Sequence, residues 1–242
     1  MAEQPRTPPS IDEIYGGEEK YTSSSVFEKI STKDWYDMVA HLTSKQFCDS
    51  DEIKILDFGG GDGVAYDEIN QRLGPLEYHL DWNIVEIAGV IEKYKNPQNE
   101  YPLWHLQVSD VDKEIDVVYA DGAIQCVSEW EKTLAELCSK NPKWIFIHRL
   151  PAGDFKTAKA KTRADRREVE YGLDDNSDTL VFWFFNIEDF LEQLDSLGYS
   201  LYDSHLYGYH YDWFLIEDEK INSQTHRKKP RSRVSLVFEK TN

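Results

Sequence analysis

Short apolar runs and amphipathic segments alternate along most of this chain, and glycine, proline and acidic residues separate them. Brief apolar runs rich in β-branched residues predict buried strands, whereas longer segments with apolar residues roughly three or four positions apart predict helices. On this basis we predict five successive strands, at residues 53–58, 78–87, 103–108, 115–120 and 144–147.

Helical patterns lie between these strands, at residues 64–73, 88–94 and 128–139. In the last of them, Ser128 and Glu131 have the spacing of a capping box. Further along, Asn186 and Gly198 bracket another helix, and strands follow at 199–207 and 233–239. This alternation predicts an α/β doubly wound sheet, mostly parallel, with helices on both faces. Ligands then bind beyond the strand C-termini, where the strand order reverses.

The most informative stretch follows the first strand, where an acid is followed by glycines at alternate positions: Asp57, Gly59, Gly61 and Gly63. Glycine permits tight turns and a close approach of ligand to backbone, and the next helix begins at the loop. A dinucleotide site needs Gly-x-Gly-x-x-Gly, but Val64 and Tyr66 stand where the last glycine would be. The alternative pattern, acid-x-Gly-x-Gly-x-Gly, fits in full. Here the chain resembles the class I S-adenosylmethionine-dependent methyltransferases.

Two further segments narrow the resemblance, residues 119–125 and 148–151. Together with the glycine loop they are similar to methyltransferases found in surface-polysaccharide gene clusters. That group commonly has serine at the position of Asp121 and tyrosine at that of Cys126. The resemblance implies a Rossmann-like sheet of seven strands that ends in a C-terminal antiparallel hairpin. The expected organisation is a disordered tail, rich in proline over residues 1–10, and an N-terminal helical cap within residues 1–50. A methyltransferase domain follows at 51–242, with an insertion at about 152–185.

The resemblance also implies how S-adenosylmethionine would be held. Glu86 would bind the ribose hydroxyls, with Asp81 as the alternative. Ser109 and Asp110 would lie near the adenine. Asp57 would order the loop or receive the ammonium group through water. The cofactor-binding residues are therefore predicted to be Asp57, Gly59, Gly60, Gly61, Gly63, Glu86, Ser109, Asp110, Asp121 and Gly122.

For catalysis, His148 is the first candidate for a general base, because its ordinary pKa of about 6.5 suits proton removal near neutral pH. The alternative is a histidine packed at a strand end. Asp121 is the second candidate. Arg149 could hold a substrate carboxylate or phosphate by its planar fork, or form a structural ion pair. His205 and Tyr209 are lesser candidates for acceptor binding.

Three segments keep two interpretations. Aromatic residues in a helical pattern at 26–42 either close over the cofactor or cover the sheet. A basic stretch at 156–167 is a solvated helix, or a lid that grips an anionic substrate. The aromatic run at 179–185 is an inserted strand or a wall of the substrate pocket.

Composition then limits the function. The net charge of −18 argues against nucleic acid or anionic membrane as a main partner. Apolar runs are too short for a membrane span, and the three cysteines lack metal-ligand spacing, which predicts a cytoplasmic protein with reduced thiols and no metal. We therefore predict a methyltransferase for a small molecule or glycan, acting on oxygen. A non-catalytic module that binds S-adenosylmethionine and a nicotinamide-dependent oxidoreductase are the alternatives.

Overall fold

The computed structural model describes residues 31–48, 50, 52–73, 79–111, 114–153, 156–163, 179–207, 213–214 and 232–241. The predicted disordered tail lies outside these residues, as does Tyr209. The helical pattern that begins at residue 26 is described from residue 31 onwards, where the structure has one helix, α3 (Thr32–Gln46).

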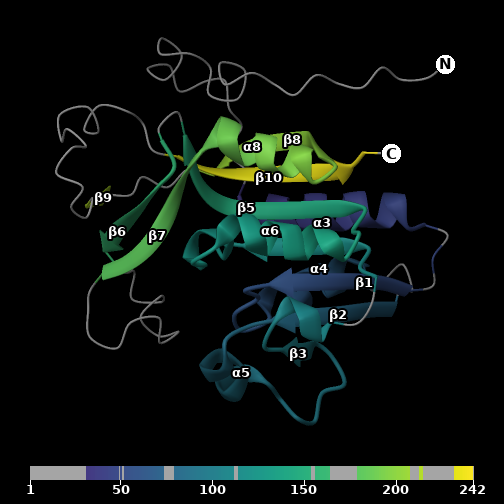
Figure 1. Ribbon diagram of the computed structural model, residues 1–242. Helices are drawn as coiled ribbons and strands as arrows, with labels where there is room; N and C mark the ends of the chain where they lie inside the picture. Colours follow the sequence, from purple (N-terminus) through teal and green to yellow (C-terminus); the bar gives the residue numbers. More distant parts are fainter. Residues whose placement is uncertain are drawn as a thin grey trace, which may run out of the picture.

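In the described chain, seven strands form a central sheet in the order β3–β2–β1–β4–β5–β10–β8 (Figure 1). Neighbouring strands from β3 to β5 are parallel, and β10 is antiparallel to both β5 and β8. The predicted sheet and its C-terminal hairpin are thus confirmed. The strand order reverses between β1 and β4. The strands are β1 (Glu52–Phe58), β2 (His79–Val85), β3 (Leu103–His105), β4 (Val117–Asp121), β5 (Trp144–Gly153), β8 (Tyr199–Tyr207) and β10 (Ser232–Lys240).

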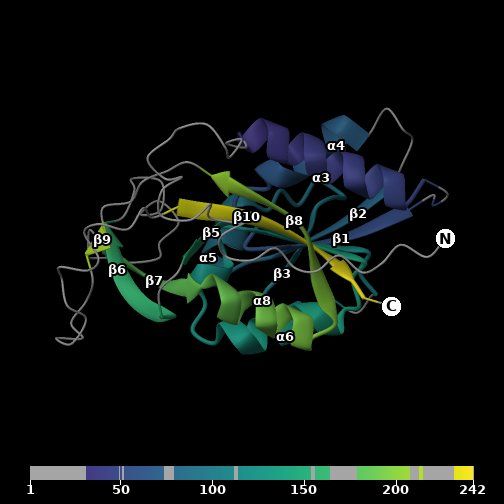
Figure 2. The ribbon, with the colours of Figure 1, turned by 90° about the horizontal axis from the view of Figure 1, so that it is seen from above.

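Helices cover both faces of this sheet (Figure 2). On one face α3 and α4 (Val64–Leu73) pack on a cluster that includes Trp35 and Ile53. On the other face α6 (Trp130–Ser139) and α8 (Ile187–Ser196) pack on a cluster that includes Leu134 and Phe190. Burying each such side chain contributes about 1.5–3 kcal/mol, so the two clusters hold the strand ends in fixed positions. A shorter helix, α5 (Ala88–Tyr94), connects β2 to β3.

The element boundaries correct several predictions. β2 ends at Val85, so Glu86 is the first residue beyond it. β3 ends at His105, three residues before the predicted end at 108, and a 3₁₀ helix, η2 (Val108–Asp110), follows. β5 continues to Gly153, well beyond the predicted end at residue 147.

The helix ends agree only in part. The Asn186 side chain accepts hydrogen bonds from the backbone N–H groups of Glu188 and Asp189, as predicted for a cap. The capping box predicted at Ser128 is wrong, because the N-cap of α6 is Glu129 and no side chain caps it.

A second group of strands leaves the sheet at the carboxyl end of β5 (left in Figure 1). β6 (Ala158–Arg163) pairs antiparallel with β7 (Thr179–Asn186) and with β9 (Trp213–Phe214), and β7 joins β5 at Ala152 and Gly153. The helix predicted for the basic stretch is therefore wrong over β6. Small and charged residues alternate there with the period of a strand, two residues, which matches the observed pairing. The aromatic run at 179–185 is an inserted strand, as one of its two interpretations held.

Candidate functional site

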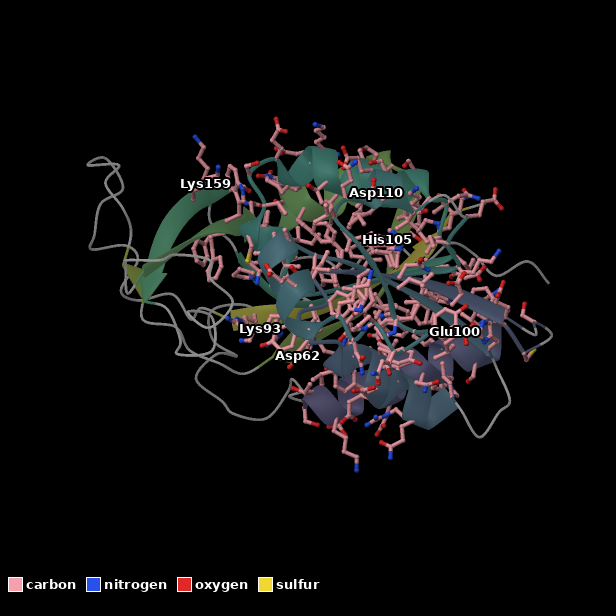
Figure 3. The ribbon with its side chains drawn as sticks, turned by 90° about the horizontal axis from the view of Figure 1, so that it is seen from below. Asp62, Lys93, Glu100, His105, Asp110 and Lys159 are labelled. Carbon is pink, nitrogen blue, oxygen red and sulfur yellow. The ribbon has the colours of Figure 1, made fainter. Side chains whose placement is uncertain are left out.

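The site lies at the carboxyl edge of the parallel strands, and we describe it in two halves. The glycine-loop half consists of Asp57 to Gly63 with the residues that follow β2 and β3. The β5 half consists of Asp121, Gly122, His148 and Arg149. Figure 3 labels Asp62, which follows β1 at this edge, and Glu100, which precedes β3 at the opposite edge.

The glycine loop requires its glycines for physical reasons. Gly59, Gly61 and Gly63 have φ angles of 70°, 58° and 85°, a region that side-chain-bearing residues rarely adopt. A Cβ at Gly59 would lie 2.4 Å from the Cβ of Ala123, and one at Gly60 would lie 2.5 Å from Asp57 Oδ2. The loop therefore presents bare backbone at the point where β1 ends.

The Glu86 carboxylate is fixed against this loop. Its Oε1 accepts the Gly61 N–H at 3.0 Å, and its Oε2 accepts the Ile87 N–H at 2.8 Å. The alternative ribose ligand, Asp81, lies instead in the middle of β2, is buried, and accepts a hydrogen bond from the Asn83 side chain. The geometry therefore places Glu86 at the loop and Asp81 away from it.

Two apolar side chains that the sequence analysis did not single out flank Glu86. Ile87 and Leu106 are 48% and 62% exposed, although both are large and apolar. They are neighbours across the sheet edge, because the Glu86 N–H donates to the His105 carbonyl at 3.0 Å. Such exposed apolar groups suit contact with the faces of a planar ligand. The available signal was an apolar residue within two positions of each of two strand ends.

Beyond β3, Ser109 and Asp110 are exposed in η2, close in the chain to His105 (Figure 3). The Asp110 carboxylate accepts hydrogen bonds from both the backbone and the side-chain amide of Gln107. The predicted adenine contacts thus lie on the loop after β3, next to Leu106.

Asp57 is the most unusual acid of the site. It is fully buried, its Oδ2 accepts the Trp82 indole N–H at 3.2 Å, and within the described residues its Oδ1 has no hydrogen-bond partner. Burial raises the pKa of this carboxyl to about 8; the carboxylates of Asp121 and Glu86 also raise it, and the Trp82 hydrogen bond lowers it. Near neutral pH this carboxyl therefore mostly holds a proton, and a cation bound beside it would favour its ionised form.

In the β5 half, Asp121 ends β4 and forms an ion pair with the Arg149 guanidinium. Gly122 has a φ of 67°, and its N–H donates to the His148 carbonyl at 3.0 Å. A Cβ at Gly122 would lie 3.4 Å from Arg149 Nη2, so glycine leaves room for this side chain. The predicted residues Asp121, Gly122 and Arg149 are therefore brought together.

His148 does not lie at the mouth of the site, which corrects our placement of it. The residue is fully buried, its ring stacks on Trp35 of α3 with 4.7 Å between ring centroids, and its Nδ1 lies 2.6 Å from Ser235 Oγ. Burial lowers the pKa of the imidazole to about 4. The interpretation of a histidine packed at a strand end is the one that matches the structure, because α3 covers this face.

Helix α3 also brings Tyr36 to the β5 half. Its ring is nearly buried, and its phenol interacts electrostatically with Asp121 and Arg149. Burial, the largest cause, raises the pKa of this phenol well above its ordinary value, so the hydroxyl stays protonated. His205 lies on β8, directly opposite Ser235 of β10 in the strand pairing, and its Nε2 is 3.1 Å from Asp203 Oδ2.

Among the described residues, no group of three or more His, Cys, Asp or Glu side chains is arranged to hold a metal ion. No described helix is long and apolar enough to cross a membrane.

No family model matches the sequence. Over 91 residues, 37% of this chain, it is 30% identical to the non-reducing polyketide synthase epaA of Aspergillus niger, and the match covers 4% of that synthase. The chain thus spans a very small part of the curated relatives it matches.

Two solved structures are similar over nearly the whole chain. One is the 1,6-didemethyltoxoflavin-N1-methyltransferase of Burkholderia thailandensis, solved with S-adenosylhomocysteine (12% identity, TM-score 0.51, 96% of this chain and 85% of that one). The other is an S-adenosylmethionine-dependent methyltransferase of Clostridium acetobutylicum (11% identity, TM-score 0.52, 93% and 96%). At such identities the likeness concerns the fold, and it supports the predicted Rossmann-like sheet.

Proposed function

We propose that this protein is an S-adenosylmethionine-dependent methyltransferase that acts on a small molecule. The observation that carries the proposal is the glycine loop, with three left-handed glycines and the Glu86 carboxylate fixed beside it. The loop lies at the strand-order reversal of a sheet whose fold is that of the two solved methyltransferases.

The residues present fit this cofactor. Glu86 would accept the ribose hydroxyls, Ile87 and Leu106 would contact the adenine faces, and Ser109 and Asp110 would border the base. When bound, S-adenosylmethionine supplies a methyl group on a positively charged sulfur. Val64 and Tyr66 stand where a dinucleotide loop needs its last glycine, which argues against the nicotinamide alternative.

The acceptor would bind in the β5 half, under α3. There Arg149 would orient an acidic or polar group of the acceptor, and Tyr36 would donate a hydrogen bond from its protonated hydroxyl. Asp121 would take a proton from the acceptor, a role that His148 is too buried to fill because its ring lies behind Trp35. We propose oxygen as the methylated atom, since an alcohol or phenol needs such a base.

Cofactor binding is the first test. A ligand that binds only the folded state raises its melting temperature. We expect S-adenosylmethionine and S-adenosylhomocysteine to raise the melting temperature and to give heat in a calorimetric titration, and NAD to do neither. Binding of NAD without binding of either sulfur compound would overturn the proposal.

Acceptor identity is the second test. Purified protein with methyl-labelled S-adenosylmethionine would be screened against glycans, which the sequence resemblance suggests, and against aromatic polyketides, which the synthase similarity suggests. Base treatment of a labelled product separates esters from ethers, and its fragmentation separates O-methyl from C-methyl. Cofactor binding without transfer to any acceptor would favour the non-catalytic alternative.

A further inference from the structure

The pairing of β5 with β10 contains an extra residue on β5. Leu150 pairs with Val234 and Ile147 pairs with Leu236, so His148 and Arg149 together oppose Ser235 alone. Two residues opposite one define a β-bulge. The bulge lies where the pairing of β4 with β5 ends, at Asp121 opposite His148.

The bulge changes the face to which Arg149 belongs. Along β5, Trp144 and Phe146 pack in the cluster under α3, whereas Ile145 and Ile147 pack in the cluster under α6 and α8. Strict alternation would send His148 to the α3 face and the next residue to the other face. Instead Leu150 occupies the next position on the other face, and Arg149 is the inserted residue, with a φ of 57°.

The inserted Arg149 therefore meets groups on the α3 side. Its guanidinium is ion-paired with Asp121, and both charges act on the Tyr36 phenol of α3. An arginine with a left-handed backbone angle is strained, and such strain persists only where the surrounding structure imposes it. A direct side-chain contact is made across the bulge, between His148 Nδ1 and Ser235 Oγ at 2.6 Å, with both residues fully buried.

We propose that His148 and Ser235 are positioning residues, whose hydrogen bond fixes the β5 bulge and thereby directs Arg149 toward Asp121 and Tyr36. This inference deepens the proposed function, on which its catalytic meaning rests: the bond would shape the acceptor end of the site. The role differs from that of a base, because it needs only Nδ1 of His148, and Trp35 covers the ring.

The test is the Arg149 Nε–H signal in a ¹H–¹⁵N NMR spectrum, assigned by its disappearance in Arg149→Lys. In the parent the ion pair should protect this proton. Ser235→Ala and His148→Leu should accelerate its exchange with solvent at least tenfold, toward the rate in Asp121→Asn, where the partner carboxylate is absent. His148→Asn should keep the parent rate, because the asparagine amide can replace Nδ1. Ser204→Ala, a serine on the neighbouring strand β8, is the matched control and should also keep it.

An unchanged Arg149 signal in Ser235→Ala would overturn the inference, and so would equal loss in His148→Asn and His148→Leu. S-adenosylhomocysteine affinity is measured on the Ser235 and His148 variants and should stay within about twofold of the parent. If the parent itself does not bind S-adenosylhomocysteine, the proposed function fails, while the NMR result still decides whether the bond fixes the bulge. Once an acceptor is known, Ser235→Ala and His148→Leu should raise the acceptor KM more than they lower kcat. His148→Asn should keep the parent KM.

Discussion

The two halves of the site bend the backbone in the same way with different residues. In the glycine-loop half, each of the three left-handed positions is a glycine: Gly59, Gly61 and Gly63. The β5 half has two left-handed positions: Gly122, in the turn after β4, and Arg149, which lies within β5 and carries a side chain. Glycine adopts such angles without steric cost, whereas arginine does so under strain. The loop is thus built to be stable and bare, and the bulge is built to place one charged side chain.

The largest expected effect comes from placing a side chain at a left-handed glycine of the loop, as Arg149 does in the bulge. Gly59→Ala puts a side chain at a left-handed angle, which costs about 1–2 kcal/mol, and a Cβ 2.4 Å from that of Ala123, which adds about 1–3 kcal/mol. We expect lower stability in urea unfolding and loss of S-adenosylhomocysteine binding in calorimetry. Gly89→Ala is the matched control: a Cβ there meets nothing within 4 Å, and alanine favours α5 by up to about 1 kcal/mol. Parent-like binding by Gly59→Ala would show that the loop is not the cofactor site.

This contrast explains what the sequence revealed. The loop could be predicted because glycine itself marks left-handed backbone, and because a short, mostly buried strand, β1, ends directly before it. The bulge could not be read, because Arg149 carries no such mark and the extra residue shifts the alternation of a run that is apolar on both faces. His148 was misplaced for a different reason, because the sequence does not show that α3 brings Trp35 over its ring.

Glu86 provides the next largest effect in the loop half. Glu86→Ala should weaken S-adenosylhomocysteine binding by about 1.5–3 kcal/mol, the range for hydrogen bonds to a charged group. Glu100→Ala removes an equal charge at the opposite edge of the sheet and should leave the affinity unchanged (Figure 3). Asp81→Ala should instead lower stability, because it breaks the buried contact with Asn83. Titration calorimetry gives the affinity of each variant and urea unfolding gives its stability. Equal losses of affinity in Glu86→Ala and Glu100→Ala would show that only the overall charge of the protein matters.

Asp57 tests whether the loop half is prepared for a cation. Its pKa is raised from 3.8 to about 8 in the fold, so between these values the folded state holds a proton that the unfolded state has lost. Stability from this group is complete below pH 3.8 and is lost as pH rises toward 8, by up to about 1.4 kcal/mol per pH unit. Asp57→Asn should lack this slope, and urea unfolding between pH 5 and 8 would show it. If parent and variant have parallel pH profiles, the carboxyl is already ionised in the fold.

Titrating the same two proteins with ligand extends this test. Ionised Asp57 should attract the cofactor's positive charges, so S-adenosylmethionine should bind the parent more tightly at pH 8 than at pH 6. In Asp57→Asn, the part of the pH dependence that this group causes should be absent.

The smallest expected effect on stability is in the β5 half and concerns backbone strain. Arg149→Gly relieves a left-handed angle worth about 1–2 kcal/mol but removes the ion pair with Asp121, which for a side chain 38% exposed is worth about 0–1 kcal/mol. The variant should therefore equal or exceed the parent in stability, by about 0.5 kcal/mol, while acceptor methylation is lost. Arg149→Ala keeps the angle and should be about 1–2 kcal/mol less stable than Arg149→Gly in urea unfolding. Asn141→Gly is the comparison, because Asn141 has a φ of 63° in a turn and asparagine tolerates that region, so its stability should change little. If Arg149→Gly is the less stable of the two Arg149 variants, the bulge carries no strain, and the contrast between the two halves fails.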